Sequence, residues 1–155
     1  MSQVLLVTGA AGGLGRAIVA RAASVATDAG VQIAVVSRDA QHLTDAFGQA
    51  HTHIVADVST YEGAQLAVKR CVETVGAPTM LAHCVGSILL APVARTTEAQ
   101  YRDVMRANLD SAFFTLGAFV AARGNGSAMG VWMATMIGNI GGAMMMYGVG
   151  HRFGL

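Results

Sequence analysis

The sequence predicts an α/β domain built on a doubly wound parallel sheet that is incomplete at its C-terminus. Apolar segments of strand length alternate with segments whose apolar residues recur at helical spacing. Strands that are apolar throughout are buried on both faces, as in a parallel sheet covered by helices. The chain has 155 residues, 54% of them apolar and 12% charged, which is enough for one such domain and its core.

Four strands and four helices are expected before residue 124. The expected strands are residues 4–7, 31–36, 53–56 and 79–84, and the expected helices are residues 14–26, about 41–47, about 59–75 and 97–120. Ser59 with Glu62, and Thr97 with Gln100, have the spacing of a capping box at a helix start. In the last helix, Phe113 and its neighbours are expected to pack in the core. The order of elements predicts the opening half of a doubly wound fold.

The composition changes after Arg123. All nine acidic residues lie between Asp28 and Asp110, and Arg152 is the last charged residue, with none between it and Arg123. Residues 126–155 are expected to hold a fifth strand at 128–133 and then a tail rich in glycine and methionine. Three explanations for this tail stay open: a truncated or frame-shifted product, a membrane-seeking segment, or a diverged folded end. Its many glycines make it a poor spanning helix.

The segment from Thr8 to Gly15 reads TGAAGGLG and lies between the first strand and the first helix. Gly9 is expected to allow a tight turn, Gly13 to let the backbone approach a pyrophosphate, and Gly15 to let the helix pack close to the sheet. The amides and the dipole of the helix start attract phosphate groups. In this setting the glycines predict a dinucleotide-binding turn.

Ser37 and Arg38 follow the second strand, at the position that contacts the adenosine ribose in such folds. An acidic residue there would bind the 2′-hydroxyl of NAD, whereas an arginine accommodates the 2′-phosphate of NADP. The sequence therefore favours NADP(H) over NAD(H). The alternative is an ordinary solvated arginine in a loop.

With this glycine spacing the chain resembles the short-chain dehydrogenase/reductase family, whose fingerprint is TGxxxGxG. Further matches follow in order: Asp57-Val58 after the third strand, Gly86 in the segment HCVG where the family usually carries NNAG, and Asn108-Leu109 in the long helix. The resemblance covers residues 3–123 and implies a Rossmann-type domain over residues 1–125 that binds a nicotinamide dinucleotide. The cofactor-binding residues that it implies are Thr8, Gly9, Gly13, Leu14, Gly15, Ser37, Arg38, Asp57, Val58 and Gly86.

The resemblance also implies an oxidoreductase that acts on a carbonyl or alcohol substrate. Asn108 would bond the backbone of the fourth strand and hold a water of a proton relay, and it is expected to point inward because it interrupts an apolar stripe. Tyr147 matches the family's catalytic tyrosine, but His151 stands where the family has lysine, and Thr135 is the hydroxyl nearest the expected serine. We predict from this incomplete set that the chain retains at most nucleotide binding. The alternative function is a non-catalytic nucleotide-binding fragment.

Charge and cysteine content exclude several other classes. A net charge of +1 without a long basic cluster excludes a nucleic-acid-binding protein. Cys71 and Cys84 cannot form a disulfide framework, which favours the reducing cytoplasm. His51 and His53 alternate along a strand but lack further ligands, so no metal site is expected.

The resemblance implies a homo-oligomer, of whose interface this sequence holds only a part.

Overall fold

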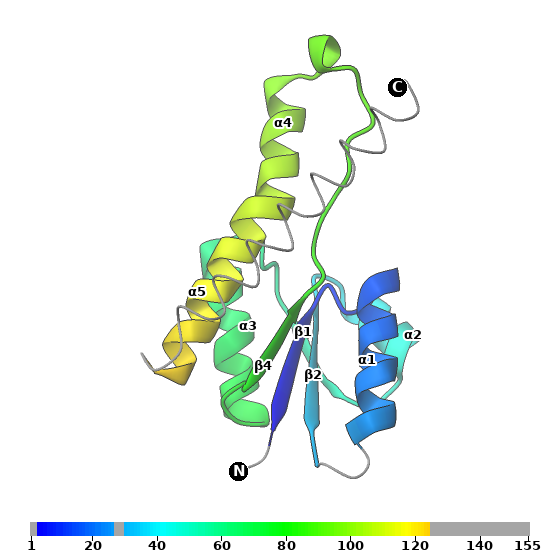
Figure 1. Ribbon diagram of the computed structural model, residues 1–155, viewed down its shortest axis with the longest axis vertical. Helices are drawn as coiled ribbons and strands as arrows, with labels where there is room; N and C mark the ends of the chain where they lie inside the picture. Colours follow the sequence, from blue (N-terminus) through cyan, green and yellow to red (C-terminus); the bar gives the residue numbers. More distant parts are fainter. Residues whose placement is uncertain (1–2, 27–29, 125–155) are drawn as a thin grey trace. The chain divides into compact units, whose positions relative to one another are not determined.

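The structure, a computed structural model, describes residues 3–26 and 30–124, and its first compact unit ends at Arg123. A parallel sheet of four strands, in the order β3-β2-β1-β4, forms the centre of this unit (Figure 1). The strands are β1 (Val4–Thr8), β2 (Gln32–Ser37), β3 (Thr52–Val55) and β4 (Met80–His83). In register, Val7 of β1 lies between Val35 of β2 and Ala82 of β4. The predicted α/β class with a parallel sheet is confirmed.

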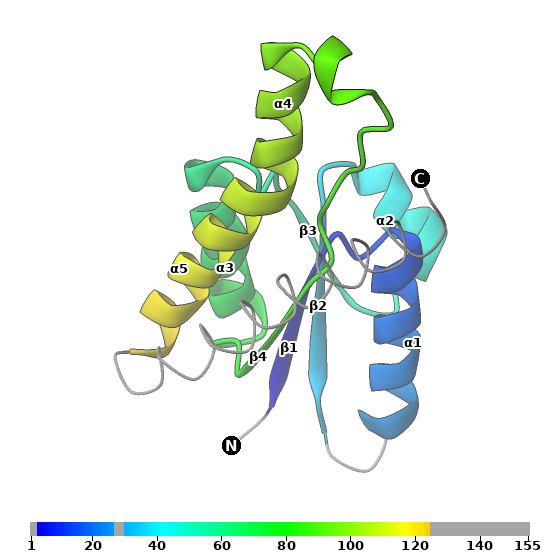
Figure 2. The same ribbon diagram turned by 45° about the horizontal axis from the view of Figure 1, so that its top comes forward.

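Helices cover both faces of the sheet, as Figures 1 and 2 show. Helices α1 and α2 lie on one side, and α3 and α5 lie on the other. The helices are α1 (Gly13–Ala26), α2 (Ala40–Phe47), α3 (Tyr61–Thr74), α4 (Glu98–Met105) and α5 (Ser111–Arg123). A short 3-10 turn (Val93–Arg95) precedes α4, and a π-helical turn (Arg106–Asp110) joins α4 to α5.

The core consists of two apolar clusters, one on each face of the sheet. Successive residues of β1 point to opposite faces, so Val4 and Leu6 belong to the cluster under α3 and α5. Leu5 and Val7 belong to the cluster under α1 and α2. Burial on both faces explains why every residue of this strand is apolar except Thr8 at its end.

Helix α3 does not begin with the predicted capping box of Ser59 and Glu62. Thr60 is the N-cap, and its Oγ1 accepts a hydrogen bond of 3.0 Å from the Gly63 amide. Ser59 instead donates its hydroxyl to Asp57 Oδ1 at 2.7 Å, as part of the turn that follows β3. The second predicted box, Thr97 with Gln100, is confirmed at the start of α4.

The predicted long helix from 97 to 120 is interrupted by the π-helical turn, and its buried face differs from the predicted one. Phe113 is 58% exposed, so its expected place in the core was wrong. The residues buried in α5 are Ser111, Thr115, Leu116, Ala118 and Phe119. The helix is apolar on nearly all sides, so hydrophobic spacing alone could not select the face, and two of its buried positions are polar.

The predicted fifth strand at 128–133 and the tail lie outside the described residues. Among residues 3–26 and 30–124, no helix is long and apolar enough to cross a membrane. Within the same ranges, no three His, Cys, Asp or Glu side chains are placed to hold a metal ion.

Candidate functional site

A cleft of about 560 Å³ opens at the carboxyl ends of the strands. Its lining comes from the end of β2, the loops after all four strands, the start of α2, and the junction of α4 with the π-helical turn. The lining residues include Gly9, Ala11, Gly12, Ser37, Arg38, His42, Ala56 to Ser59, Cys84 to Ser87, Asp103, Arg106 and Ala107. The strand order reverses between β1 and β4, and ligands of open α/β sheets bind at such a reversal. The fold therefore places this cleft where a ligand is expected.

The glycine turn after β1 is shaped by two close approaches of the backbone. Gly9 has a φ of +66°, and a Cβ on it would lie 2.7 Å from the carbonyl oxygen of Cys84. A Cβ on Gly15 would lie 2.5 Å from the carbonyl oxygen of Gly9, so the first turn of α1 lies directly against the glycine turn. A Cβ on Gly13 would meet nothing within 4 Å, which leaves open space at the first residue of α1.

The structure brings together most, but not all, of the predicted cofactor-binding residues. Gly9, Ser37, Arg38, Asp57, Val58 and Gly86 all line the cleft. Thr8 is fully buried behind the turn, where its Oγ1 lies 2.8 Å from His83 Nδ1. Gly13, Leu14 and Gly15 form the first turn of α1 beside the cleft, and Leu14 is 65% exposed.

Asp57 supplies a fixed carboxylate at the end of β3. Its Oδ1 accepts hydrogen bonds from the amide of Ser59 at 3.0 Å and from the hydroxyl of the same residue at 2.7 Å. Burial alone would raise the pKa of Asp57, but these bonds and the charges of Arg38 and Arg106 outweigh it and lower the pKa below its ordinary value. The group is therefore an ionised hydrogen-bond acceptor at neutral pH.

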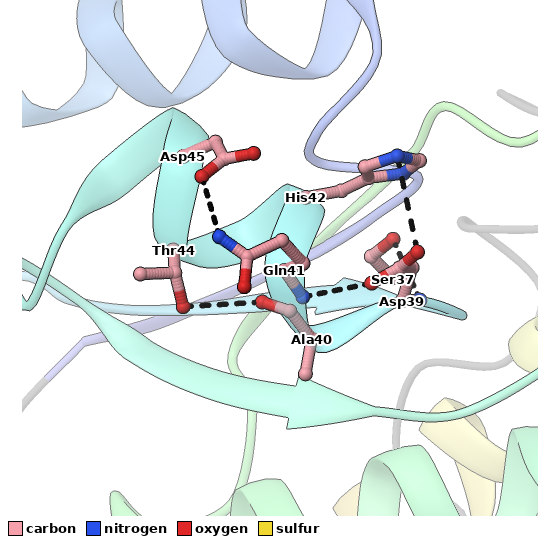
Figure 3. Close-up of polar contacts among 7 residues, drawn as sticks. All are labelled: Ser37, Asp39, Ala40, Gln41, His42, Thr44 and Asp45. Atoms are coloured by element: carbon pink, nitrogen blue, oxygen red, sulfur yellow. Dashed lines mark hydrogen bonds and ion pairs between the residues drawn. The ribbon is translucent and has the colours of Figure 1, made fainter.

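The start of α2 engages Asp39, the acidic residue that follows Arg38 in the sequence. Asp39 caps this helix, and its Oδ1 accepts a hydrogen bond of 2.7 Å from the Gln41 amide (Figure 3). Its Oδ2 lies 3.8 Å from His42 Nε2, and its amide donates to Ser37 Oγ at 3.3 Å. Sequence reasoning missed His42 as a residue of the cleft, although its place three residues after an N-cap puts it on the same turn as Asp39.

Asn108 lies in the π-helical turn and clamps the loop that follows β4. Its Oδ1 accepts from the Ser87 amide at 3.2 Å, and its Nδ2 donates to the carbonyls of Ser87 and Val104 at 2.9 and 2.8 Å. A Cβ on Gly86 would lie 2.8 Å from Asn108 Oδ1, which explains the glycine. The side chain is exposed rather than inward-pointing as expected, and it bonds the loop rather than β4 itself, because the π turn sets it beside this loop.

The sequence profile of the short chain dehydrogenase family matches residues 3–148. The chain belongs to this family. Members of the family are oxidoreductases that bind a nicotinamide dinucleotide, and the chain carries their nucleotide-binding fold.

Solved structures of short-chain dehydrogenases share the fold. A putative short-chain dehydrogenase/reductase from Burkholderia xenovorans is 27% identical with a TM-score of 0.68, and the match covers 77% of this chain and 50% of that one. A putative short-chain alcohol dehydrogenase from Sinorhizobium meliloti is 26% identical with a TM-score of 0.69, over 79% and 50% of the two chains. An actinorhodin polyketide ketoreductase with NADPH is 24% identical with a TM-score of 0.71, over 78% and 47%. The chain thus spans about half the length of the structures that it matches.

The described residues fit the adenosine half of the dinucleotide that short-chain dehydrogenases bind. The open space at Gly13 is compatible with a phosphate group near the amides at the start of α1. Ionised Asp57 accepts hydrogen bonds, as an adenine amino group requires, and Arg38 supplies a cation at the end of β2. Tyr147, His151 and Thr135, which concern catalysis, lie outside the described residues.

His83 makes two side-chain hydrogen bonds that the sequence analysis did not predict. His83, the last residue of β4, lies 2.8 Å from Thr8 Oγ1 through Nδ1 and 3.1 Å from Ser111 Oγ through Nε2. Burial lowers the pKa of His83 to about 4, so the imidazole is neutral at physiological pH. No sequence signal gives these partners, because they are 75 and 28 residues away along the chain.

Proposed function

We propose that the chain binds NADP(H) in the cleft and serves as an oxidoreductase on a carbonyl or alcohol substrate. The observation that carries this proposal is the charge at the end of β2. Arg38 lines the cleft, while the adjacent carboxylate of Asp39 is engaged by the amide of Gln41 and lies near His42. A guanidinium there would bind the 2′-phosphate, whereas the carboxylate of Asp39, which could bind the 2′-hydroxyl of NAD, caps α2 instead.

The remaining cleft residues would hold the rest of the nucleotide. The amides at the start of α1 would face the pyrophosphate beside Gly13, and Asp57 would accept the adenine amino group. Gly86 and Ser87, fixed by Asn108, would form the wall toward the nicotinamide side. When bound, NADPH would supply a hydride to the substrate carbonyl carbon, and NADP⁺ would accept a hydride from the alcohol carbon.

For catalysis we propose Asn108 and Tyr147. Tyr147 would protonate the developing alkoxide, as a general acid must in carbonyl reduction. Asn108 would hold the loop after β4 and a water that delivers the proton. His151 in place of a lysine favours a second candidate, nucleotide binding without turnover, because an imidazole lacks the permanent positive charge with which a lysine promotes the phenolate.

Fluorescence titration of NADPH and NADH tests the cofactor assignment. We expect NADPH to bind more tightly, and Arg38→Gln to weaken NADPH by roughly ten- to a hundredfold while changing NADH little, since a charge-assisted bond contributes about 1.5–3 kcal/mol. Arg21→Gln is the matched control, because Arg21 is an exposed cation of α1 outside the cleft. Equal affinities for NADPH and NADH in the wild-type protein would refute the NADP(H) preference.

Turnover separates the two candidate functions. NADPH consumption with a panel of small ketones, lost in Tyr147→Phe, would establish the oxidoreductase. Binding of NADPH without consumption of any ketone would establish the non-catalytic alternative.

We also infer a cytoplasmic location. Both cysteines are free thiols, Cys71 buried and Cys84 half-buried, as in proteins of a reducing compartment. Trapping of both thiols by a permeant alkylating reagent in intact cells would support this location, whereas their recovery as disulfides would contradict it.

A further inference from the structure

The buried side of the cleft contains a continuous chain of three polar side chains. Thr8 and Ser111 are fully buried, and the half-buried ring of His83 lies between them. His83 Nδ1 lies 2.8 Å from Thr8 Oγ1, and His83 Nε2 lies 3.1 Å from Ser111 Oγ. Ser111 continues the chain by donating its hydroxyl to the carbonyl oxygen of Ala107 at 2.7 Å.

The available donors and acceptors fix the direction of each bond. Because the Ser111 hydroxyl gives its hydrogen to Ala107, its oxygen must accept from His83 Nε2–H. In the neutral imidazole the other ring nitrogen is then unprotonated, so Nδ1 accepts from the Thr8 hydroxyl. Both ring nitrogens of His83 therefore have a hydrogen-bond partner. The bond from Ser111 to Ala107 sets the direction of the bond from His83 to Ser111, and that bond sets the direction of the bond from Thr8 to His83.

This series of hydrogen bonds joins three elements that adjoin the walls of the cleft. Thr8 is the last residue of β1 and directly precedes the glycine turn. His83 is the last residue of β4 and leads into the loop of Gly86 and Ser87. Ser111 is the first residue of α5 and directly follows the π-helical turn.

We propose that His83 is a positioning residue that fixes the π-helical turn against the glycine turn. Through Ser111 and Ala107, His83 holds Asn108 in the position from which the Asn108 side-chain amide bonds Ser87. Hydrogen bonds are directional, so they set this spacing more narrowly than apolar contacts of the same size would. Gly9 and Ala107 lie in the two turns that His83 connects, and both line the cleft. A loss of this connection should therefore weaken nucleotide binding, and this consequence rests on the proposed function.

Two conservative substitutions separate the two bonds of the ring. In His83→Asn the amide oxygen takes the place of Nδ1 and can accept from Thr8, but the side chain is too short for Ser111. In His83→Gln the amide nitrogen takes the place of Nε2 and can donate to Ser111, but the bond to Thr8 is lost. If His83 acts by connecting the two turns, neither variant holds Asn108 in place, although each keeps one of the two hydrogen bonds. Ser111→Ala breaks the same connection from the other end and serves if a His83 variant does not fold.

The experiment measures the Asn108 side-chain amide by NMR and the NADPH dissociation constant by fluorescence. We expect His83→Asn, His83→Gln and Ser111→Ala to shift the Asn108 amide signals and to speed their exchange with water. We expect NADPH affinity to fall about tenfold in each, the effect of one lost buried hydrogen bond. We expect Val68→Ala, a core substitution in α3 that removes none of these hydrogen bonds, to lower stability without either effect.

Unchanged Asn108 signals in the three variants would overturn the positioning role, as would equal shifts in Val68→Ala. Absence of NADPH binding by the wild-type protein would overturn the proposed function instead. In that case the Asn108 signals still decide the role of His83, because they require no nucleotide.

Discussion

Acidification from pH 7 to pH 5 should destabilise the protein through His83. Burial lowers the pKa of His83 to about 4, against about 6.5 for a histidine in the unfolded chain. Between pH 6.5 and pH 4 the histidine binds a proton in the unfolded state but not in the folded state. The contribution of neutral His83 to the free energy of unfolding is therefore complete above pH 6.5 and falls as the pH drops toward 4. Each tenfold change in proton affinity corresponds to ~1.4 kcal/mol, which gives a loss of about 2 kcal/mol at pH 5.

Urea unfolding followed by circular dichroism at pH 7 and pH 5 measures this loss. His83→Asn lowers stability at pH 7 because it gives up the bond to Ser111, but it should lose about 2 kcal/mol less than the wild-type protein on acidification. The pKa of His51 is also lowered, first by burial and second by the charge of His53. The difference between the stability losses of the two proteins cancels this contribution of His51. His42→Asn, at an exposed histidine, is the matched control and should keep the wild-type loss. An equal loss in wild type and His83→Asn would refute the reasoning.

Three substitutions test other parts of the structure. Gly86→Ala should weaken NADPH binding at least tenfold in a fluorescence titration, because its Cβ would lie 2.8 Å from Asn108 Oδ1 and would displace Asn108 from Ser87. Unchanged affinity would contradict this expectation. Thr115→Val should leave the free energy of unfolding unchanged or raise it by about 1 kcal/mol, since the buried Thr115 hydroxyl has no hydrogen-bond partner among the described residues; a clear loss in urea unfolding would reveal a missed partner. Thr60→Ala should lower the free energy of unfolding by about 1 kcal/mol in the same assay, because Thr60 rather than Ser59 caps α3; no loss would speak against this cap.

The sheet and the glycine turn were predictable because their causes are local in the sequence. A strand such as β1, buried on both faces, must be apolar along its length, and this is visible without a structure. Gly9 and Gly15 are required by backbone approaches within the turn and by the neighbouring loop, so their spacing between a strand and a helix indicates the motif.

The face of α5 and the π-helical turn were not predictable from hydrophobic spacing. Residues 112–122 are apolar on nearly every side except at Thr115, which is buried, while Phe113 is exposed. No residue type marks a π-helical turn in advance, yet this turn decides where Asn108 lies. Such turns are frequent at functional sites, which agrees with its place beside the cleft.

The partners of His83 could not be predicted because they are distant in sequence and ordinary in type. Thr8 was assigned to the glycine motif, and Ser111, three residues after Asn108, carries no signal that would link it to His83. Only the parallel pairing of β4 with β1 brings His83 beside Thr8, and only the packing of α5 brings Ser111 to the other side of the ring.

Amide chemical shifts during a titration with NADP⁺ test most directly whether this cleft binds the dinucleotide. We predict that the largest shifts occur in the loops after the strands, at Gly12, Arg38 and Val58, which line the cleft. Residues 49–52 line a second hollow at the start of β3, at the opposite end of the sheet, and should not move. Shifts centred on residues 49–52, or no shifts at saturating NADP⁺, would contradict the assignment of the nucleotide to the carboxyl ends of the strands.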